Sequence, residues 1–597
     1  MRQPILQCSS LLAALAFASS AGAVTMYVSP DGAASSGCYY DIPCSLDAAT
    51  KLAVPGDTIV LKDGVYKQQG IYPPANTQPA TPAYITWQAD ECALPIIEGA
   101  GVGPLEDNQD SGMYADAATY LRFVGIAMRG WSSGFSNKFQ DTDPSTPPTS
   151  NGHFEYINCI ADGNGRTGFT MFSADGLHIK NSIAAHNGSS ILHSWSSGIT
   201  LLEVQGDALI EGNISFENMD NHDVAQAPDS PGKHSDGNGF IVDENSNGAT
   251  FVNNVGFRNG GSCLRLTRSS GTKFINNTCY HNAQDTMATG PTNPSEVYFT
   301  LPSSGQTDPR TGVTFMNNIF WATGSAQAMM AIYQKPTSGW MNNIEATSGT
   351  APLTAPDGTN PDFTLSAGAT AAIDKGGANA AAPTDDVGFD PKCIVKKAPT
   401  PIGMMTQGSW WQYSIDYDYI KSIGGIAKCF NSATRDGTND IGAYNSGPLK
   451  TSPVTTCTPT IPPDHAGPGG GTAGAGGTAS TGGGAGTAAG TTGTTTGGTA
   501  TGGTATGGTG SSSGGGVATG AGTGPGTGGA GTGTAGTAAT GISAGTSSAT
   551  PNAPATTDDG GCGCRIGQQP SRSSLLLGVG AFGALLLGLR RRRQSRR

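Results

Sequence analysis

A repeated asparagine motif in the middle of the chain constrains the fold more than any other feature. Six segments share an apolar residue, an asparagine, a short apolar stretch and a polar turn, and WMNNIEATSG is a weaker seventh. We align them on Asn158, Asn181, Asn213, Asn254, Asn277, Asn318 and Asn343, which are separated by 23, 32, 41, 23, 41 and 25 residues. A minimum period with longer variants is typical of a solenoid whose loops lengthen on some turns.

The repeat predicts strands rather than helices. Its apolar stretches are short, rich in β-branched residues and lack helical periodicity. One period of this length, holding two or three short strands, matches one coil of a right-handed parallel β-helix. We therefore predict an all-β, right-handed parallel β-helix solenoid. The asparagines suit its tight turns and can stack as a hydrogen-bonded ladder along the axis, so we interpret them as structural.

The two ends of the chain predict export. Residues 1–23 have a basic start, an apolar stretch and a small-residue site, as in a secretory signal peptide. Residues 24–463 are the predicted β-helix domain, and residues 464–557, almost only Gly, Thr, Ala and Ser, are a predicted disordered linker. Residues 558–597 carry an apolar segment, 575–589, followed by an arginine cluster. This segment is short for a transmembrane helix, which favours a processed sorting signal over a permanent anchor.

Charge and cysteines fit this picture. Without the signal peptide and tail, 23 basic residues stand against 42 acidic ones, which argues against nucleic acid as a partner. Nine cysteines remain outside the two ends, and export permits disulfides. We expect a local Cys38–Cys44 bridge and a bridge from Cys393 to Cys429 or Cys457. Because nine is odd, at least one cysteine is free or bonded to another chain.

The stretch KHSDGNGFIVDEN, residues 233–245, places unusual charge beside a short apolar strand. The coil from Asn213 to Asn254 is lengthened by a predicted loop, 218–238, and loops on a rigid scaffold often carry function. The loop and the strand after it hold Asp220, Asp223, Lys233, His234, Asp236 and Asp243, and the next coil offers Arg265 and Arg268. His193 and Trp195 are candidate substrate-binding residues, since an indole can stack on a sugar ring.

Two parts of the sequence resemble known families. Asp558–Cys564, the apolar segment and the arginines resemble the myxobacterial C-terminal sorting tail, MYXO-CTERM, which implies cleavage near Cys562 or Cys564 and display at the cell surface or outer membrane. Residues 26–66, with a predicted helix at 45–52, resemble the opening of bacterial β-helix proteins that include family-nine pectate lyases. Residues 360–376 and 440–444 resemble the closing segment of the same superfamily.

The lyase resemblance implies a specific chemistry. In that family, aspartates of successive coils bind one calcium ion and a lysine takes the proton next to the sugar carboxylate. The resemblance implies that the calcium ligands here are Asp220, Asp223, Asp236 and Asp243. It also implies that the candidate catalytic residues are Lys233, His234, Asp236, Arg265 and Arg268. This sequence has no Asp-Asp-Gly-Trp pair, and FRNGGSCLRL stands where acids are expected. The sequence thus predicts a monomeric surface protein that acts on or binds polysaccharide, with a calcium-assisted lyase acting on uronate-containing glycans as one form. A non-catalytic adhesin and a glycoside hydrolase using Asp236 and Asp243 are the alternatives.

Two further features are interpreted as structural. His186 and His281 follow predicted strands and are expected to be solvated turn residues. The aromatic patch 410–419 is expected to cover the last coil of the solenoid.

Overall fold

The computed structural model describes most of residues 22–457 and does not describe the linker or the tail. The described residues are 22–34, 37–74, 82–101, 111–115, 118–137, 152–188, 196–204, 206–219, 236–284, 295–300, 302, 305, 307–322, 335–377, 383–397, 411–431, 434–435, 440–444, 446 and 457. No helix among them is long and apolar enough to cross a membrane.

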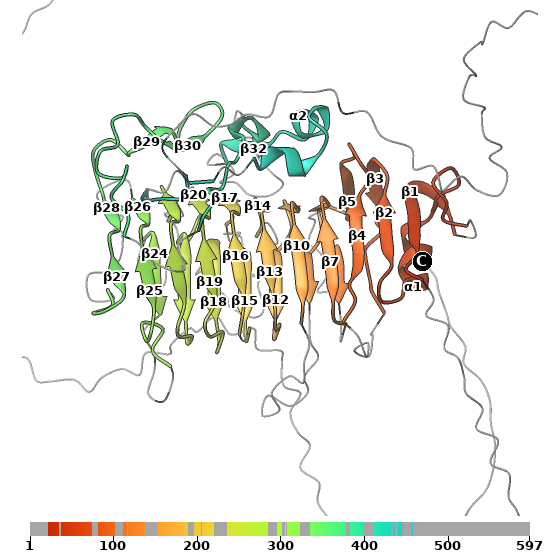
Figure 1. Cartoon of the computed structure of the whole chain (residues 1–597), viewed down its shortest axis with the longest axis horizontal. Coiled ribbons are helices and arrows are strands. Elements are labelled where there is room, and N and C mark those ends of the chain that lie inside the picture. Colours follow the sequence, from red (N-terminus) through yellow and green to blue (C-terminus); the bar gives the residue numbers. More distant parts are fainter. Residues whose placement is uncertain are drawn as a thin grey trace, which may run out of the picture. The chain divides into compact units, whose positions relative to one another are not determined.

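Three long parallel sheets form the body of this region, as Figure 1 shows. Sheet A contains β1 (Thr25–Ala33), β2 (Thr58–Leu61), β4 (Ile85–Ala89), β7 (Leu121–Val124), β10 (Phe154–Ile157), β13 (His178–Lys180), β16 (Leu209–Glu211), β19 (Thr250–Val252), β22 (Lys273–Ile275), β25 (Thr314–Met316) and β27 (Trp340–Met341), in that order. Sheet B contains β3 (Gly64–Lys67), β5 (Pro95–Glu98), β8 (Ala127–Arg129), β11 (Ile160–Asp162), β14 (Ile183–Ala185), β17 (Ile214–Phe216), β20 (Val255–Phe257), β23 (Thr278–Tyr280), β26 (Ile319–Trp321) and β28 (Ile344–Ala346).

Sheet C is shorter, and its strands are β6 (Met113–Ala115), β9 (Ser133–Asn137), β12 (Thr167–Phe172), β15 (Ser197–Leu202), β18 (Asn238–Asp243), β21 (Leu264–Thr267) and β24 (Val297–Thr300). Where a full turn is described, the chain visits A, B and C once per coil, and each strand pairs in parallel with its equivalent on the next coil. This is the predicted parallel β-helix. Inward side chains stack along the axis, as Trp87, Phe123 and Tyr156 do at centroid distances of 5.1 and 5.3 Å.

The predicted first helix is present and closes the first coil. It is α1 (Leu46–Leu52), and the Ser45 hydroxyl accepts a hydrogen bond from the Ala48 N–H at 3.2 Å, which caps its start. Leu46 and Ala49 are fully buried against the first strands, so the helix shields the end of the core as a solenoid cap does.

The asparagine ladder is confirmed from Asn213 onward. Amide-to-amide hydrogen bonds of 2.8–3.1 Å join Asn213, Asn254, Asn277, Asn318 and Asn343 in sequence. Our alignment was wrong by one residue on the earlier coils. Asn158 and Asn181 occupy the left-handed turn position, with φ of 53° and 49°, whereas Cys159 and Ser182 take the stacked position.

A second ladder runs through the interior, between sheets B and C. Side-chain hydrogen bonds of 2.8–2.9 Å join Asn164, Asn187, Asn218, Asn259 and Asn282. The ladder ends at the buried Glu296 carboxyl, which accepts from the Asn282 backbone and side-chain N–H groups at 3.0 and 2.6 Å. Burial raises the pKa of Glu296 to about 8.

The chain after β28 turns back and covers sheet B. We call residues 347–446 the cover segment; its elements are β29 (Leu353–Ala355), β30 (Asp362–Leu365), the 3₁₀ helix Pro391–Cys393, β31 (Ile394–Lys396), β32 (Tyr413–Ile415), α2 (Tyr417–Ser422) and the 3₁₀ helix Ile426–Cys429. Figure 1 shows it running along one edge of the coils towards β5. Phe363 and Tyr413 pack on Phe257 of sheet B at 4.8 and 5.6 Å, so the aromatic patch covers middle coils rather than the last one.

Four disulfides join cysteines within the described part of the chain. Cys38–Cys44 is confirmed, and Cys393 pairs with Cys429. The remaining bonds are Cys92–Cys457 and Cys263–Cys279, and Cys159 is the free, buried cysteine among the described residues.

Candidate functional site

The described part of the charged stretch, residues 236–245, contains β18, which lies within sheet C between β15 and β21. In β18, Phe240 and Val242 belong to the core, and strand alternation places Ile241 and Asp243 on the opposite face. The parallel register sets Ile241 beside Arg265 of β21 and Arg265 beside Tyr298 of β24. Three successive coils therefore contribute to one cluster.

Asp236 and Arg265 form a buried ion pair. Their carboxylate and guanidinium groups are hydrogen-bonded, and their side chains are only 1% and 2% exposed. The Arg265 guanidinium also lies 5.6 Å from the centre of the Tyr298 ring, and its Nε is 3.4 Å from the Thr300 hydroxyl. Because removing either partner would leave a buried charge uncompensated, the pair fixes both side chains.

Asp243 completes the cluster as a buried carboxyl with a raised pKa. Burial raises its pKa to about 8, and the nearby carboxyls of Glu244 and Asp236 act in the same direction, while Arg265 opposes them. Asp243 is therefore mainly protonated at neutral pH. The Asp236 and Asp243 carboxyls thus lie in different environments, since Asp236 has a direct cationic partner. In active sites such a difference lets one carboxyl act as the acid and the other as the base.

Arg268 lies at the rim of the cluster. Its guanidinium pairs with Glu244 at 2.7 Å, and both side chains are 25% exposed. Ion pairs of this exposure contribute little to stability, so Arg268 is placed for contact with solvent or a ligand.

The structure thus brings together Asp236, Asp243 and Arg265, with Arg268 beside them. The other candidates lie outside the described residues and stay predictions: Asp220, Asp223, His193, Trp195, Lys233 and His234. Of the described members of the calcium set, Asp236 is bound to the Arg265 guanidinium, and the calcium site stays a prediction. Among the described residues no group of three His, Cys, Asp or Glu side chains could hold a metal ion.

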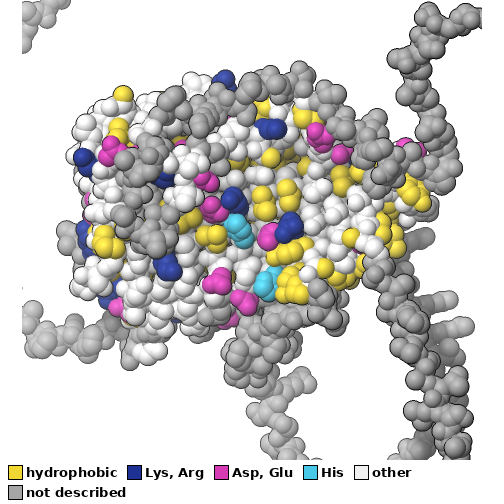
Figure 2. Space-filling model, viewed as in Figure 1, with side chains coloured by type: hydrophobic (Ala, Val, Ile, Leu, Met, Phe, Trp, Pro, Cys, Tyr) yellow, Lys and Arg dark blue, Asp and Glu magenta, His cyan; other side chains and the backbone are white. Residues whose placement is uncertain are grey.

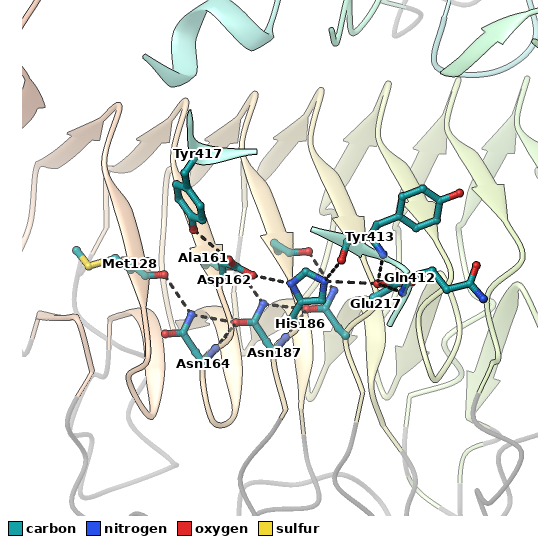
Figure 3. A network of polar contacts seen from close by, with 12 residues as sticks. Met128, Ala161, Asp162, Asn164, His186, Asn187, Glu217, Gln412, Tyr413 and Tyr417 are labelled. Carbon is teal, nitrogen blue, oxygen red and sulfur yellow. Dashed lines mark hydrogen bonds and ion pairs between the residues drawn. The ribbon is translucent and has the colours of Figure 1, made fainter. Parts of the chain in front are cut away.

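A second charged array, missed in the sequence, lies along sheet B under the cover segment (Figure 3). His186 follows β14; its Nδ1 is 2.7 Å from Asp162, and its Nε2 is 3.0 Å from the Tyr413 carbonyl and 3.4 Å from Glu217. Although burial opposes protonation, the two carboxylates raise its pKa to about 10. His186 is 6% exposed, so our interpretation of it as a solvated turn residue was wrong.

The array continues on the next coils and holds the cover segment. Glu217, fully buried, accepts the N–H groups of Gln412 and Tyr413 at 2.8–3.1 Å, and Arg258 donates to it at 3.1 Å. Asp, His, Glu, Arg and His occur near the same position of the repeats, in ADGN, AAHN, SFEN, GFRN and CYHN. This alternation of charge could have revealed the array in the sequence. The residues of the cover segment that bind the array, however, lie about two hundred positions further along the chain.

Elsewhere the surface charges are mixed. Figure 2 shows acidic, basic and histidine side chains beside one another on one face of the molecule. On sheet A, Arg122 pairs with Glu155 at 2.5 Å, and Glu211 pairs with Lys180 and His178 at 3.2 Å.

No family model and no curated protein matches the chain. Among solved structures, it is similar to the pectate lyase Pel9A, with 16% identity, a TM-score of 0.41 and coverage of 61% of this chain and 94% of that one. A rhamnogalacturonan lyase is similar with 13% identity, a TM-score of 0.33 and coverage of 56% of this chain and 91% of that one. A lacto-N-biosidase from Eubacterium ramulus is similar with 14% identity, a TM-score of 0.29 and coverage of 54% of this chain and 67% of that one. Similarity at this level assigns no activity to this chain.

Proposed function

We propose that this protein is an exported polysaccharide-cleaving enzyme whose reaction centre is the cluster of Asp236, Asp243 and Arg265 on sheet C. The proposal is supported by two carboxyl groups that lie in one cluster, because the Asp243 carboxyl, whose pKa burial raises to about 8, suits a general acid at neutral pH. Asp236, the ionised partner of Arg265, is the second carboxyl of the pair.

The chemistry assigned to the cluster is acid–base cleavage of a glycosidic bond. Asp243 gives its proton to the leaving oxygen as the bond to that oxygen breaks. As the oxygen of a water molecule bonds to the anomeric carbon, Asp236 takes a proton from that water, and Arg265 holds Asp236 in place. Glycoside hydrolases generally use two carboxyl groups that flank the bond being cleaved. Arg265 and Arg268 are ion-paired cations, and an arginine side chain stays protonated in proteins, so neither supplies the base that elimination needs. Lys233 and His234 remain the candidate bases for elimination.

The first test measures products from a panel of neutral and uronate-containing polysaccharides, using the full chain with calcium and with chelator. New reducing ends without conjugated unsaturated ends would support hydrolysis. Unsaturated ends that require calcium would instead assign the lyase reaction and draw attention to Asp220, Asp223 and Lys233. Binding of a polysaccharide without any product would favour the adhesin, for which the buried Asp236–Arg265 pair would be purely structural.

Two matched variants locate the chemistry. Asp243→Asn keeps the shape of the side chain and removes its acid, so we expect a loss of about 10²–10⁴-fold in turnover. Glu296→Gln removes a carboxyl with the same pKa of about 8 that serves the second asparagine ladder, and it should retain turnover. Equal activities of the two variants would refute the assignment of Asp243.

A further inference from the structure

A cleft opens between sheet B and the cover segment, on a different sheet from the Asp243 cluster. Its volume is about 550 Å³, within the ~300–1,000 Å³ usual for small-molecule sites. Ends of β5, β8 and β11 form one wall, and Lys397 with the residues around β32 and the start of α2 forms the other. Gly101 and Gly163 line it at turns with φ of 93° and 63°, where added Cβ atoms would meet nothing within 4 Å.

One wall presents a row of charged groups in register. Glu98, Arg129 and Asp162 are partners on three successive coils. Arg129 pairs with Glu98 at 2.7 Å, and their side chains are 34% and 28% exposed. The carboxylates and the guanidinium offer acceptors and donors at the spacing of the coils, about 4.8 Å, and hydroxyl groups of a sugar can bond to both.

The opposite wall is aromatic and firmly held. The Tyr417 hydroxyl donates to Asp162 at 3.0 Å, and the Arg129 guanidinium lies 5.5 Å from the centre of its ring. Trp411 packs at 4.8 Å from the His186 ring, and β32 is fixed by the Glu217 carboxylate. Because this wall is anchored by buried charged groups, the cleft is formed before any ligand arrives, which lowers the entropic cost of binding.

Lys397 gives the cleft its excess charge. Among the lining cations of the described part of the chain, Arg129 is paired with Glu98 and His186 with Asp162 and Glu217. Lys397 lines the same cleft, is exposed, and has no ion pair within the described residues. A carboxylate brought by a ligand can pair with it.

We propose that this cleft is a second carbohydrate site, which binds an acidic sugar unit through Lys397, the Glu98–Arg129–Asp162 row and the aromatic wall. This second site rests on the proposed function only for the class of ligand, which is carbohydrate in both cases. Binding in the cleft needs no reaction at Asp243. A site on a second face would hold a polymer while another segment of it reaches sheet C.

Calorimetric titration of the full chain tests this, with digalacturonate as the acidic probe and cellobiose as the neutral one. We expect digalacturonate to bind more tightly than cellobiose, and Lys397→Gln to weaken it about tenfold, the effect of one charge-assisted hydrogen bond. Lys375→Gln makes the same charge change at an exposed lysine outside the cleft and should leave the affinity unchanged. Melting temperatures confirm that both variants are folded.

Asp243→Asn separates this site from the reaction centre. It should bind digalacturonate like the unaltered chain whether or not the chain cleaves polysaccharide, so failure of the proposed function would leave the binding result intact. Loss of binding in Asp243→Asn would place the ligand on sheet C and overturn the second site. Equal affinities of the two lysine variants, equal affinity for the two probes, or no binding of either probe by folded protein would also overturn it.

Discussion

The buried Asp243 carboxyl predicts a pH dependence of stability that one substitution should remove. In the folded protein Asp243 releases its proton with a pKa of about 8, whereas in the unfolded chain its pKa is about 3.9. Between these values the unfolded chain binds fewer protons than the folded one, so the free energy of unfolding falls as the pH rises. The slope for one proton is about 1.4 kcal/mol per pH unit.

The size of the effect follows from the width of this window. Raising the pH from about 5 to about 8 lowers the contribution of this one group by roughly 3–4 kcal/mol. Asp243→Asn carries no titrating proton and should lack that loss. The variant should match the unaltered chain at the acidic end, where Asp243 is neutral, and exceed it at the alkaline end, where an ionised carboxylate must stay buried.

Urea unfolding followed by tryptophan fluorescence, with disulfides intact, measures this as the difference between variant and unaltered chain at each pH. Other titrating groups affect both proteins and cancel in the difference. Glu296→Gln should show a difference of similar size, because its pKa is also about 8, although it should keep its activity. If Asp243→Asn and the unaltered chain lose stability in parallel over this range, Asp243 is ionised at neutral pH and its role as the acid fails.

Three further predictions concern the scaffold. His186→Gln should cost about 3–5 kcal/mol at neutral pH, because it removes the cation between two carboxylates. The loss should shrink steadily as the pH rises from about 6.5, where the unfolded histidine releases its proton, to about 10, where the folded one does, and equal losses at all pH values would contradict it. Asn277→Ala, in the middle of its ladder, should lower the free energy of unfolding in urea by about 2–5 kcal/mol, since it leaves buried N–H groups of the preceding coil unsatisfied. Asn343→Ala, at the less buried end of the ladder, should lower it clearly less. Removing both Cys92 and Cys457 should lower the free energy of unfolding by about 2–5 kcal/mol, and an unchanged unfolding midpoint would show that this bond adds nothing to stability.

The sequence alone determined the architecture, because a solenoid repeats one local solution and leaves a period that can be counted. The stacked Asn213 and Asn254, the short helix of the first coil and the local Cys38–Cys44 bridge depend on neighbours along the chain or one coil away, and residue type suffices to predict them. The single-residue error at Asn158 and Asn181 has the same origin. An asparagine suits both the left-handed turn and the stacked position beside it, and only the backbone separates the two.

Only the tertiary structure decided what the charges do. It set Arg265 against Asp236 and buried Asp243, and burial, which no pattern of letters measures, is what moves a carboxyl pKa. It also brought Tyr413 and Tyr417 back over His186 and Asp162, across more than two hundred residues of chain. Contacts at that separation follow from the path of the cover segment rather than from any repeat, so the cleft they form had no counterpart in the sequence.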